Sequence, residues 1–276
     1  MGISRVGAPD AWKVSRGKGV KLAVIDTGID MTHPELAGII KGGWNAISTA
    51  ATFNDDNGHG THVSGTIAAK DDGAGVVGVA PQIDLYGVKV LDEGGSGTFD
   101  GVIAGMLWAI ENKMEIASMS LGADQGNQAL ADAVEAMRKA GVILIAASGN
   151  SGGSVGYPAA YPGAIAVGAS DSKDKLASFS SRGPAVAVIA PGVDVKSTYM
   201  GAATTRCRGR RWPRRTWPGS RPSTSRRTRA RRRRRRARRS RPPPPSSRAC
   251  RTWARGGPSE RLEARPGPLT AGQAFL

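Results

Sequence analysis

The chain has 276 residues, with 39 Lys and Arg against 22 Asp and Glu, and a formal net charge of +17. That average conceals a split. Residues 1–200 hold 15 basic and 20 acidic residues (net −5), whereas residues 201–276 hold 24 Arg, no Lys and 2 Glu (net +22). Attraction to nucleic acid or to an anionic membrane is therefore expected of the second part alone.

Composition excludes several classes of protein. No apolar run approaches the roughly 18 residues that a membrane span needs, so no membrane association is expected. The polar stretch 1–20 lacks the apolar core of a secretory signal peptide. Both cysteines, Cys207 and Cys250, follow residue 200, which excludes a disulfide framework or a Cys-ligated metal from the first part.

Eight segments of residues 1–200 have the apolar pattern of a strand or a helix. In chain order, we expect strands at 20–25 and 83–90, a helix at 98–112, a strand at 114–119, a helix at 127–140, and strands at 142–147, 164–168 and 185–190. Continuously apolar strands between amphipathic helices predict an α/β fold, with a mostly parallel sheet covered by helices on both faces. In such sheets, sites form beyond the carboxyl ends of the strands.

Residues 201–276 have a different character. They include the runs Arg231–Arg236 and Pro242–Pro245, and their apolar residues show no period. Charge repulsion and the lack of core material predict a disordered Arg/Pro-rich tail after a folded domain at 1–200.

The first chemically distinctive segment is Ala23–Asp30, in which a buried strand ends at Asp26-Thr27-Gly28. A carboxylate held at a strand end is suited to orienting an imidazole. A turn or helix-capping role for Asp26 is the alternative interpretation.

The second segment is Asn57–Ala68, in which glycines precede an apolar helix expected to begin near His62. A His at a helix start beside a cleft is well placed to be a general base, and we assign this role to His62. His59 and His62 also have i, i+3 spacing, but no Glu lies between them in the H-E-x-x-H sense, and His33 is the only other His.

The third segment is Ile145–Gly153, which directly follows a predicted strand. The side-chain amide of Asn150 on this Gly-rich turn is suited to donating a hydrogen bond to an oxyanion. A simple turn is the alternative, since Gly-Asn and Gly-Gly are turn dipeptides.

Together these segments resemble the subtilisin-like serine proteases, which carry Asp-Thr/Ser-Gly, His-Gly-Thr-His-Val-x-Gly and Ala-x-Gly-Asn in this chain order. The resemblance extends from about Gly2 to about Tyr199 and includes Gly78–Pro81, Met119–Gly122 and Phe179–Pro184. It implies a serine endopeptidase with a Ser-His-Asp triad, to which Asp26 and His62 would contribute while His59 would not.

The resemblance also implies sites for substrate. Two segments match those that pair with an extended substrate backbone in the family: Gly95, Ser96 and Gly97, and Ser120, Leu121 and Gly122. A third, made of Ala147, Ser148 and Gly149, matches a wall of the pocket for the residue before the scissile bond. A peptide or protein in extended conformation is the expected partner.

A structural Ca²⁺ site is a further implication, and no organic cofactor is expected. His33–Leu36 stands where the family often has a His-Pro-Asp ligand, and Lys70–Val76 resembles the loop that wraps the ion. Oxygen ligands suit this hard cation. Carboxylates of Glu35 and Asp72 and carbonyls of Lys70, Ala74 and Val76 would supply them.

The family's nucleophile segment, Gly-Thr-Ser-Met-Ala-x-Pro-His-Val-Ala-Gly, is missing after Ser197–Tyr199. When the codons of residues 204–219 are read from their third base, Trp212-Pro213 and Trp217-Pro218 must each give Ala. The remaining codons permit the rest of that segment in register. We therefore hypothesise that the reading frame changes between about Tyr199 and Thr204, so that the tail is out-of-frame translation and the chain as written is a poor enzyme.

Three functions remain open from the sequence. The first is a subtilisin-like serine endopeptidase in its correctly framed form, expected to be secreted and monomeric. The second is a catalytically dead remnant of the same scaffold. The third is a protein that binds nucleic acid through its Arg tail, where the contact with phosphates would be non-specific.

Overall fold

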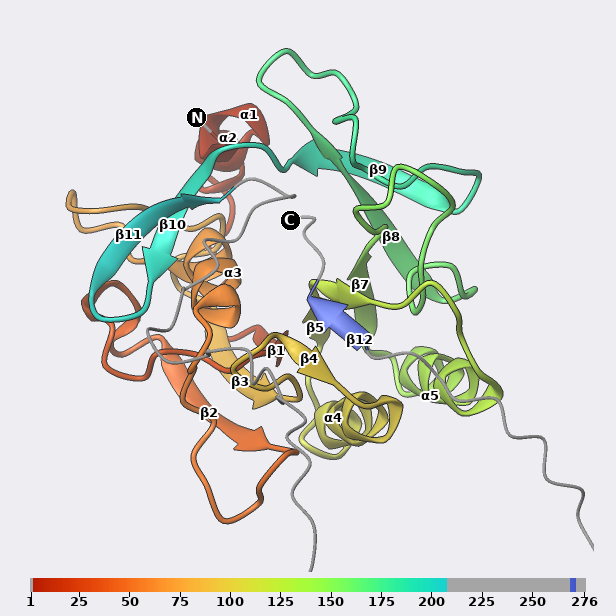
Figure 1. The fold of residues 1–276 in the computed structure, drawn as a ribbon. Coiled ribbons are helices and arrows are strands. Elements are labelled where there is room, and N and C mark those ends of the chain that lie inside the picture. The colour runs from red at the N-terminus through yellow and green to blue at the C-terminus, as the bar shows by residue number, and fades with distance from the viewer. Residues whose placement is uncertain (1, 208–268, 272–276) are drawn as a thin grey trace, which may run out of the picture. The chain divides into compact units, whose positions relative to one another are not determined.

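The computed structural model describes residues 2–207 and 269–271. Its centre is a seven-stranded sheet in the order β2-β3-β1-β5-β7-β8-β9, in which every pair of neighbours is parallel (Figure 1). The strands are β1 Lys21–Asp26, β2 Ile40–Asn45, β3 Asp84–Lys89, β5 Ile116–Met119, β7 Ile143–Ala147, β8 Ala164–Ser170 and β9 Val186–Pro191. The predicted α/β class is confirmed.

The helices of the described region cover both faces of this sheet (Figure 1). They are α1 Gly2–Arg5, α2 Ala8–Ala11, the 3-10 helix η1 Pro34–Leu36, α3 His59–Ala68, α4 Phe99–Glu111 and α5 Gln128–Lys139. None of them is long and apolar enough to cross a membrane.

Strand β1 shows why both faces must be covered. Leu22 and Val24 pack with Val63 and Ile67 of α3, whereas Ala23 and Ile25 belong to the apolar cluster that includes residues of α4 and α5. Successive side chains of a strand point to opposite faces, so an unbroken apolar run buries residues on both.

The two predicted long helices begin at residues that cap them. The Thr98 hydroxyl accepts a hydrogen bond from the Gly101 amide at 3.1 Å, and the Asn127 side chain accepts one from the Leu130 amide at 2.8 Å. Each side chain satisfies an amide that the first helical turn leaves without an intrahelical partner.

Two smaller sheets complete the described structure. Strands β10 (Val195–Tyr199) and β11 (Ala203–Cys207) form an antiparallel pair. Strand β12 (Leu269–Ala271) lies between β4 (Ser96–Gly97) and β6 (Leu121–Gly122), antiparallel to both.

The structure corrects two predictions and adds strands that were not predicted, among them β2, β10 and β11. Ordered structure continues past residue 200 because β11 pairs with β10 and Cys207 is 1% exposed within the cluster under α3. Helix α3 begins at His59, not near His62. Strand β2 was not predicted. The remainder of the predicted tail, 208–268 and 272–276, lies outside the described residues.

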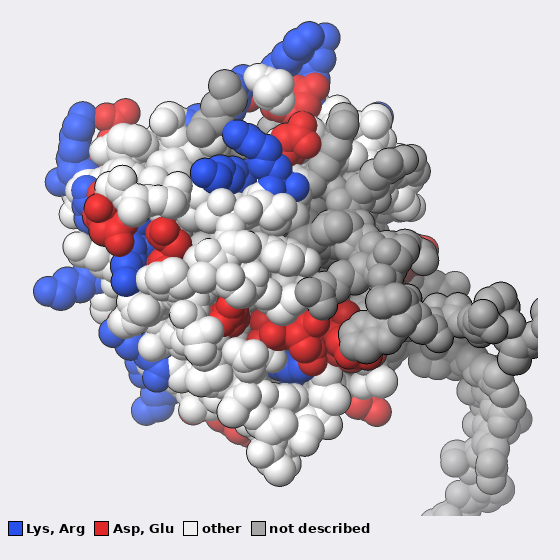
Figure 2. Space-filling view, turned by 60° about the vertical axis from the view of Figure 1, so that its left-hand side comes forward, with Lys and Arg blue, Asp and Glu red and all other residues white. Residues whose placement is uncertain are grey.

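The face shown in Figure 2 carries basic and acidic side chains interspersed rather than one dominant sign. That distribution agrees with the small net charge of residues 1–200.

Candidate active site

The site begins at the carboxyl end of β1, at the middle of the sheet. Asp26 is the last residue of β1 and is 0% exposed. The chain continues from β1 to β2 and β3 on one side and later to β5 on the other. The crevice at such a reversal of strand order is where open α/β sheets bind their ligands.

The imidazole beside Asp26 belongs to His59 and not to His62, to which the sequence analysis gave the role of general base. His59 Nδ1 lies 2.7 Å from Asp26 Oδ1, and both side chains are 0% exposed. The same carboxylate oxygen accepts the Thr27 amide at 2.7 Å, which fixes the carboxylate relative to its own turn.

His62 lies one helical turn further along α3 and serves a different contact. Its Nε2 is 3.1 Å from the Val195 carbonyl oxygen of β10, and its own carbonyl accepts the Ser197 hydroxyl at 2.8 Å. Burial, followed by the neighbouring His59, lowers the pKa of His62 to about 4. His62 is thus a neutral side chain that joins α3 to β10.

The position of His59 beside Asp26 has a local physical cause. The helix starts three residues earlier than the apolar pattern indicated, because Gly58 adopts a left-handed φ of 104° and ends the preceding turn. His59 is consequently the first helical residue and lies level with the end of β1. The position of Gly58 directly before His59 is the signal that identifies the earlier start.

The turn after β1 and the start of α3 approach closely enough to require glycine. A Cβ on Gly60 would lie 2.0 Å from the Gly28 carbonyl oxygen, well inside any tolerated contact. The glycines of the second segment thus allow the backbone contact that brings Asp26 and His59 together.

The predicted substrate-backbone segments form a slot that accepts a strand. Ser96–Gly97 is β4 and Leu121–Gly122 is β6, and the chain's own β12 pairs antiparallel with both. Thr270 is opposite Ser96 on one side and Gly122 on the other. Figure 1 shows β12 beside β4.

Two further predicted positions lie around this slot. Gly95 is buried in the turn before β4, where its amide donates to the Asp92 carbonyl at 2.9 Å. Ser120 is 3% exposed and separates β5 from β6.

A pocket of about 210 Å³ adjoins the ends of β5 and β7. Five of the predicted site residues line it, and Ser148 is buried next to them with its hydroxyl donating to the Ser181 carbonyl at 3.2 Å. The five are Leu121, Gly122, Ala147, Gly149 and Asn150. Because β1, β5 and β7 are consecutive neighbours, this pocket and the Asp26–His59 pair lie at the same edge of the sheet.

The amide oxygen of Asn150 is buried and has no hydrogen-bond partner among the described residues. Burying such an atom without a partner is costly, and such sites in folded proteins are often functional. Asn150 therefore lies on the wall of the pocket with an acceptor oxygen that no described residue satisfies.

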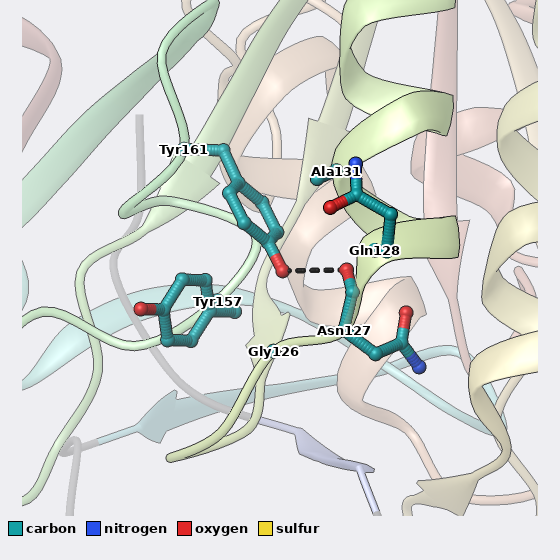
Figure 3. A pocket seen from close by; sticks show the side chains of 6 residues that line it. All are labelled: Gly126, Asn127, Gln128, Ala131, Tyr157 and Tyr161. Atoms are coloured by element: carbon teal, nitrogen blue, oxygen red, sulfur yellow. Dashed lines mark hydrogen bonds between the residues drawn. The ribbon is translucent and has the colours of Figure 1, made fainter. Parts of the chain in front are cut away.

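A second pocket, of about 190 Å³, contains none of the predicted residues. It is lined by Gly126, Asn127, Gln128, Ala131, Tyr157 and Tyr161, and Figure 3 shows the Tyr161 hydroxyl donating to the Asn127 carbonyl across it at 2.8 Å. Apart from the two tyrosine hydroxyls, this lining holds no titratable side chain.

The predicted Ca²⁺ ligands come together only in part. Glu35 Oε2 is buried without a partner in the described region, and a Cβ on Gly75 would lie 1.9 Å from Glu35 Oε1. The Glu35 carboxylate therefore lies against the backbone of the 70–76 loop. Asp72 is exposed, and its Oδ1 accepts the Ala74 amide at 3.1 Å.

Among the described residues, no three acidic, His or Cys side chains are grouped in a way that could hold a metal ion. A cation at Glu35 would have to depend on backbone carbonyls for most of its ligands.

Comparison with known proteins gives a consistent assignment. Residues 17–224 match the model of the subtilase family. Subtilisin Savinase from Lederbergia lenta is 49% identical over 203 residues, which are 73% of this chain and 74% of that protein. The alkaline protease of Alkalihalobacillus alcalophilus is 49% identical over 203 residues, and the minor extracellular protease Epr of Bacillus subtilis is 47% identical over 201 residues. These matches cover 73% and 72% of this chain, but only 53% and 31% of the two relatives.

Proposed function

Because the chain belongs to the subtilase family, we propose that its correctly framed product is a serine endopeptidase in which Asp26 orients His59 and His59 is the general base. The observation that carries this proposal is the 2.7 Å contact between two fully buried side chains at the reversal point of the sheet. A carboxylate at Nδ1 favours the tautomer with its lone pair on Nε2, and that nitrogen can then take a proton from a hydroxyl nucleophile.

The remaining steps fall to the pocket and the slot. The substrate backbone would lie between β4 and β6 as an extended strand, in the way β12 does. Side chains of the substrate would enter the pocket at Ala147–Gly149. The amide of Asn150 would donate to the carbonyl oxygen as negative charge develops on it.

We infer that the missing nucleophile is encoded in a displaced frame that begins between about Tyr199 and Thr204. The forced Ala codons at Trp212-Pro213 and Trp217-Pro218, in register with the family's segment, support this inference. Sequencing the coding DNA across codons 195–225 tests it. A single inserted or missing base would restore the segment, whereas DNA that matches the chain as written would leave a scaffold without a nucleophile.

Hydrolysis of a chromogenic peptide by the restored-frame protein tests the proposed function. In subtilisin, loss of His from the triad lowers kcat about 10⁶-fold. We expect a loss of that order for His59→Ala, whereas His62→Ala should keep most of its activity per folded molecule. Equal losses in the two folded variants would contradict the assignment, and an inactive restored-frame protein would favour the dead remnant.

A structural Ca²⁺ ion at Glu35 is part of this proposal. The buried, unpartnered Glu35 Oε2 and its position against Gly75 support it. The carboxylate of Asp72 and the carbonyls of Lys70, Ala74 and Val76 would provide the remaining ligands from the protein. The ion's contribution would be to stabilise the 70–76 loop rather than to take part in hydrolysis.

We also propose that the enzyme acts outside the cell and as a monomer. The name of the related minor extracellular protease supports the location. Detection of the restored-frame protein in culture supernatant, together with its molar mass in solution, would test both statements.

A further inference from the structure

A buried carboxylate that the proposed reaction does not use is hydrogen-bonded to residues next to Asp26 and on both sides of His59. Asp55 is 4% exposed and accepts five hydrogen bonds. Its Oδ1 accepts the Thr27 hydroxyl at 2.9 Å and the amides of Asn57 and Gly58 at 3.0 and 2.9 Å. Its Oδ2 accepts the Thr61 amide at 2.9 Å and the Thr61 hydroxyl at 2.6 Å.

These donors come from the two segments that carry the pair. Thr27 directly follows Asp26, whereas Asn57, Gly58 and Thr61 lie on both sides of His59. Thr27 adds a second link, because its hydroxyl oxygen accepts the Gly60 amide at 2.8 Å. The Asp55 carboxylate and the Thr27 hydroxyl thus connect the end of β1 to the first turn of α3.

A buried lysine holds the same turn from the neighbouring strand. Lys89, at the end of β3, is 5% exposed, and its Nζ donates to the carbonyls of Thr27 and Leu91 at 2.8 Å each. It also donates to Asp56 Oδ1 at 2.7 Å, next to Asp55 in the chain. The Thr27 backbone is therefore fixed on its carbonyl side independently of Asp55.

We propose that Asp55 is a positioning residue, which acts through Thr27 and the 57–61 backbone to set the contact between His59 Nδ1 and Asp26 Oδ1. This inference rests on the proposed function for its significance, but not for its test. Catalytic groups have to be held within about 0.5 Å of their working geometry, and a hydrogen-bonded neighbour is the usual means. Hydrogen bonds to an ionised acceptor are about twice as strong as neutral ones, so one carboxylate can order both segments.

The test measures the pair directly by NMR on the full chain, with no need for hydrolysis. A proton on His59 Nδ1 shared with Asp26 gives a low-field ¹H signal, which His59→Gln identifies by removing it. Asp55→Asn replaces two acceptor oxygens by one, and Thr27→Val removes the hydroxyl without changing the side-chain shape. We expect the signal to be lost in both variants while their far-UV circular dichroism stays native.

Two matched controls separate positioning from stability. Thr27→Ser keeps the hydroxyl and should restore the signal. Asp30→Asn alters another buried carboxylate, which is 6% exposed and accepts bonds from Thr32 and Gly201 but none from the 57–61 backbone. It should lower stability and retain the signal.

The results that would overturn the proposal are equally definite. A signal that persists in folded Asp55→Asn or in folded Thr27→Val would show that the pair needs neither group. If Asp30→Asn lost the signal to the same extent as Asp55→Asn and Thr27→Val, the loss would reflect a general decrease in stability and not positioning by Asp55. Loss of the cooperative fold in both Asp55→Asn and Thr27→Val would assign a purely structural role. An inactive restored-frame enzyme that retains the expected NMR pattern would refute the proposed function alone.

Discussion

Protonation of His62 should make the folded protein unstable in mild acid. His62 is fully buried, and burial is the main cause that lowers its pKa from the ordinary 6.5 to about 4. The positive field of His59 acts in the same direction, while backbone hydrogen bonds to Val195 and Thr205 oppose it. Below pH 6.5 the unfolded chain therefore binds a proton that the folded protein does not accept until about pH 4.

The sign and size follow from linkage. Where the unfolded state binds more protons, the free energy of unfolding rises with pH. Stability from a neutral His62 is thus fully present above pH 6.5 and is lost as the pH falls toward 4. The interval between the two pKa values corresponds to on the order of 3 kcal/mol, a large share of the stability of an ordinary domain.

The measurement is urea unfolding of the full chain and of His62→Gln at about pH 7 and about pH 4. Gln keeps a donor for the Val195 carbonyl but does not titrate. The variant should be less stable at neutral pH and should lose about 3 kcal/mol less than the original chain on acidification. Surface groups such as Glu135, whose pKa the hydrogen bond from Arg138 lowers to about 2, are common to both proteins and cancel.

Equal losses of free energy in the two proteins would refute this reasoning, because they would show that His62 binds its proton equally well folded and unfolded. A larger loss in His62→Gln would have the wrong sign and would mean that protonated His62 stabilises the fold. Either result would also remove the argument that a neutral His62 joins α3 to β10.

Three further outcomes are expected. Calcium should raise the melting temperature of the full chain, and Glu35→Gln should abolish that rise. Asp174→Asn, which alters an exposed carboxylate paired with Arg5, is the control and should keep the rise. An unchanged response to calcium in Glu35→Gln would place the ion elsewhere. Gly60→Ala should lower the free energy of unfolding, measured in urea, by about 1–3 kcal/mol or more, because its Cβ would meet the Gly28 carbonyl. Gly101→Ala in α4 is the control, since the nearest contact of its Cβ would be at 3.3 Å. It should change the free energy of unfolding by less than about 1 kcal/mol. Deleting residues 266–276 should speed amide hydrogen exchange in β4 and β6, and unchanged exchange would show that β12 does not occupy the slot in solution.

The strands of the central sheet that sequence predicted are those with an unbroken apolar run. Strands β1, β3, β5 and β7 are short apolar runs, and each was expected within a few residues of its place. Strand β2 escaped because Lys41, Gly42 and Gly43 interrupt its pattern at the edge of the sheet. The hairpin of β10 and β11 is polar along most of its length, so periodicity gives no signal for it.

Sequence analysis expected Asp26 to orient the imidazole of His62, whereas the structure has His59 beside Asp26. This difference shows why a motif alone does not assign a role. The two imidazoles are three residues apart, both are 0% exposed, and residue type does not distinguish a general base from a buried neutral hydrogen-bonding group. The distinction comes from the level of each ring along α3, which depends on where the helix begins. That start is set by Gly58 and by the hydrogen bonds that Asp55 accepts, two features with no hydrophobic signature. The same residues that sequence periodicity overlooks are therefore the ones that decide which histidine meets Asp26.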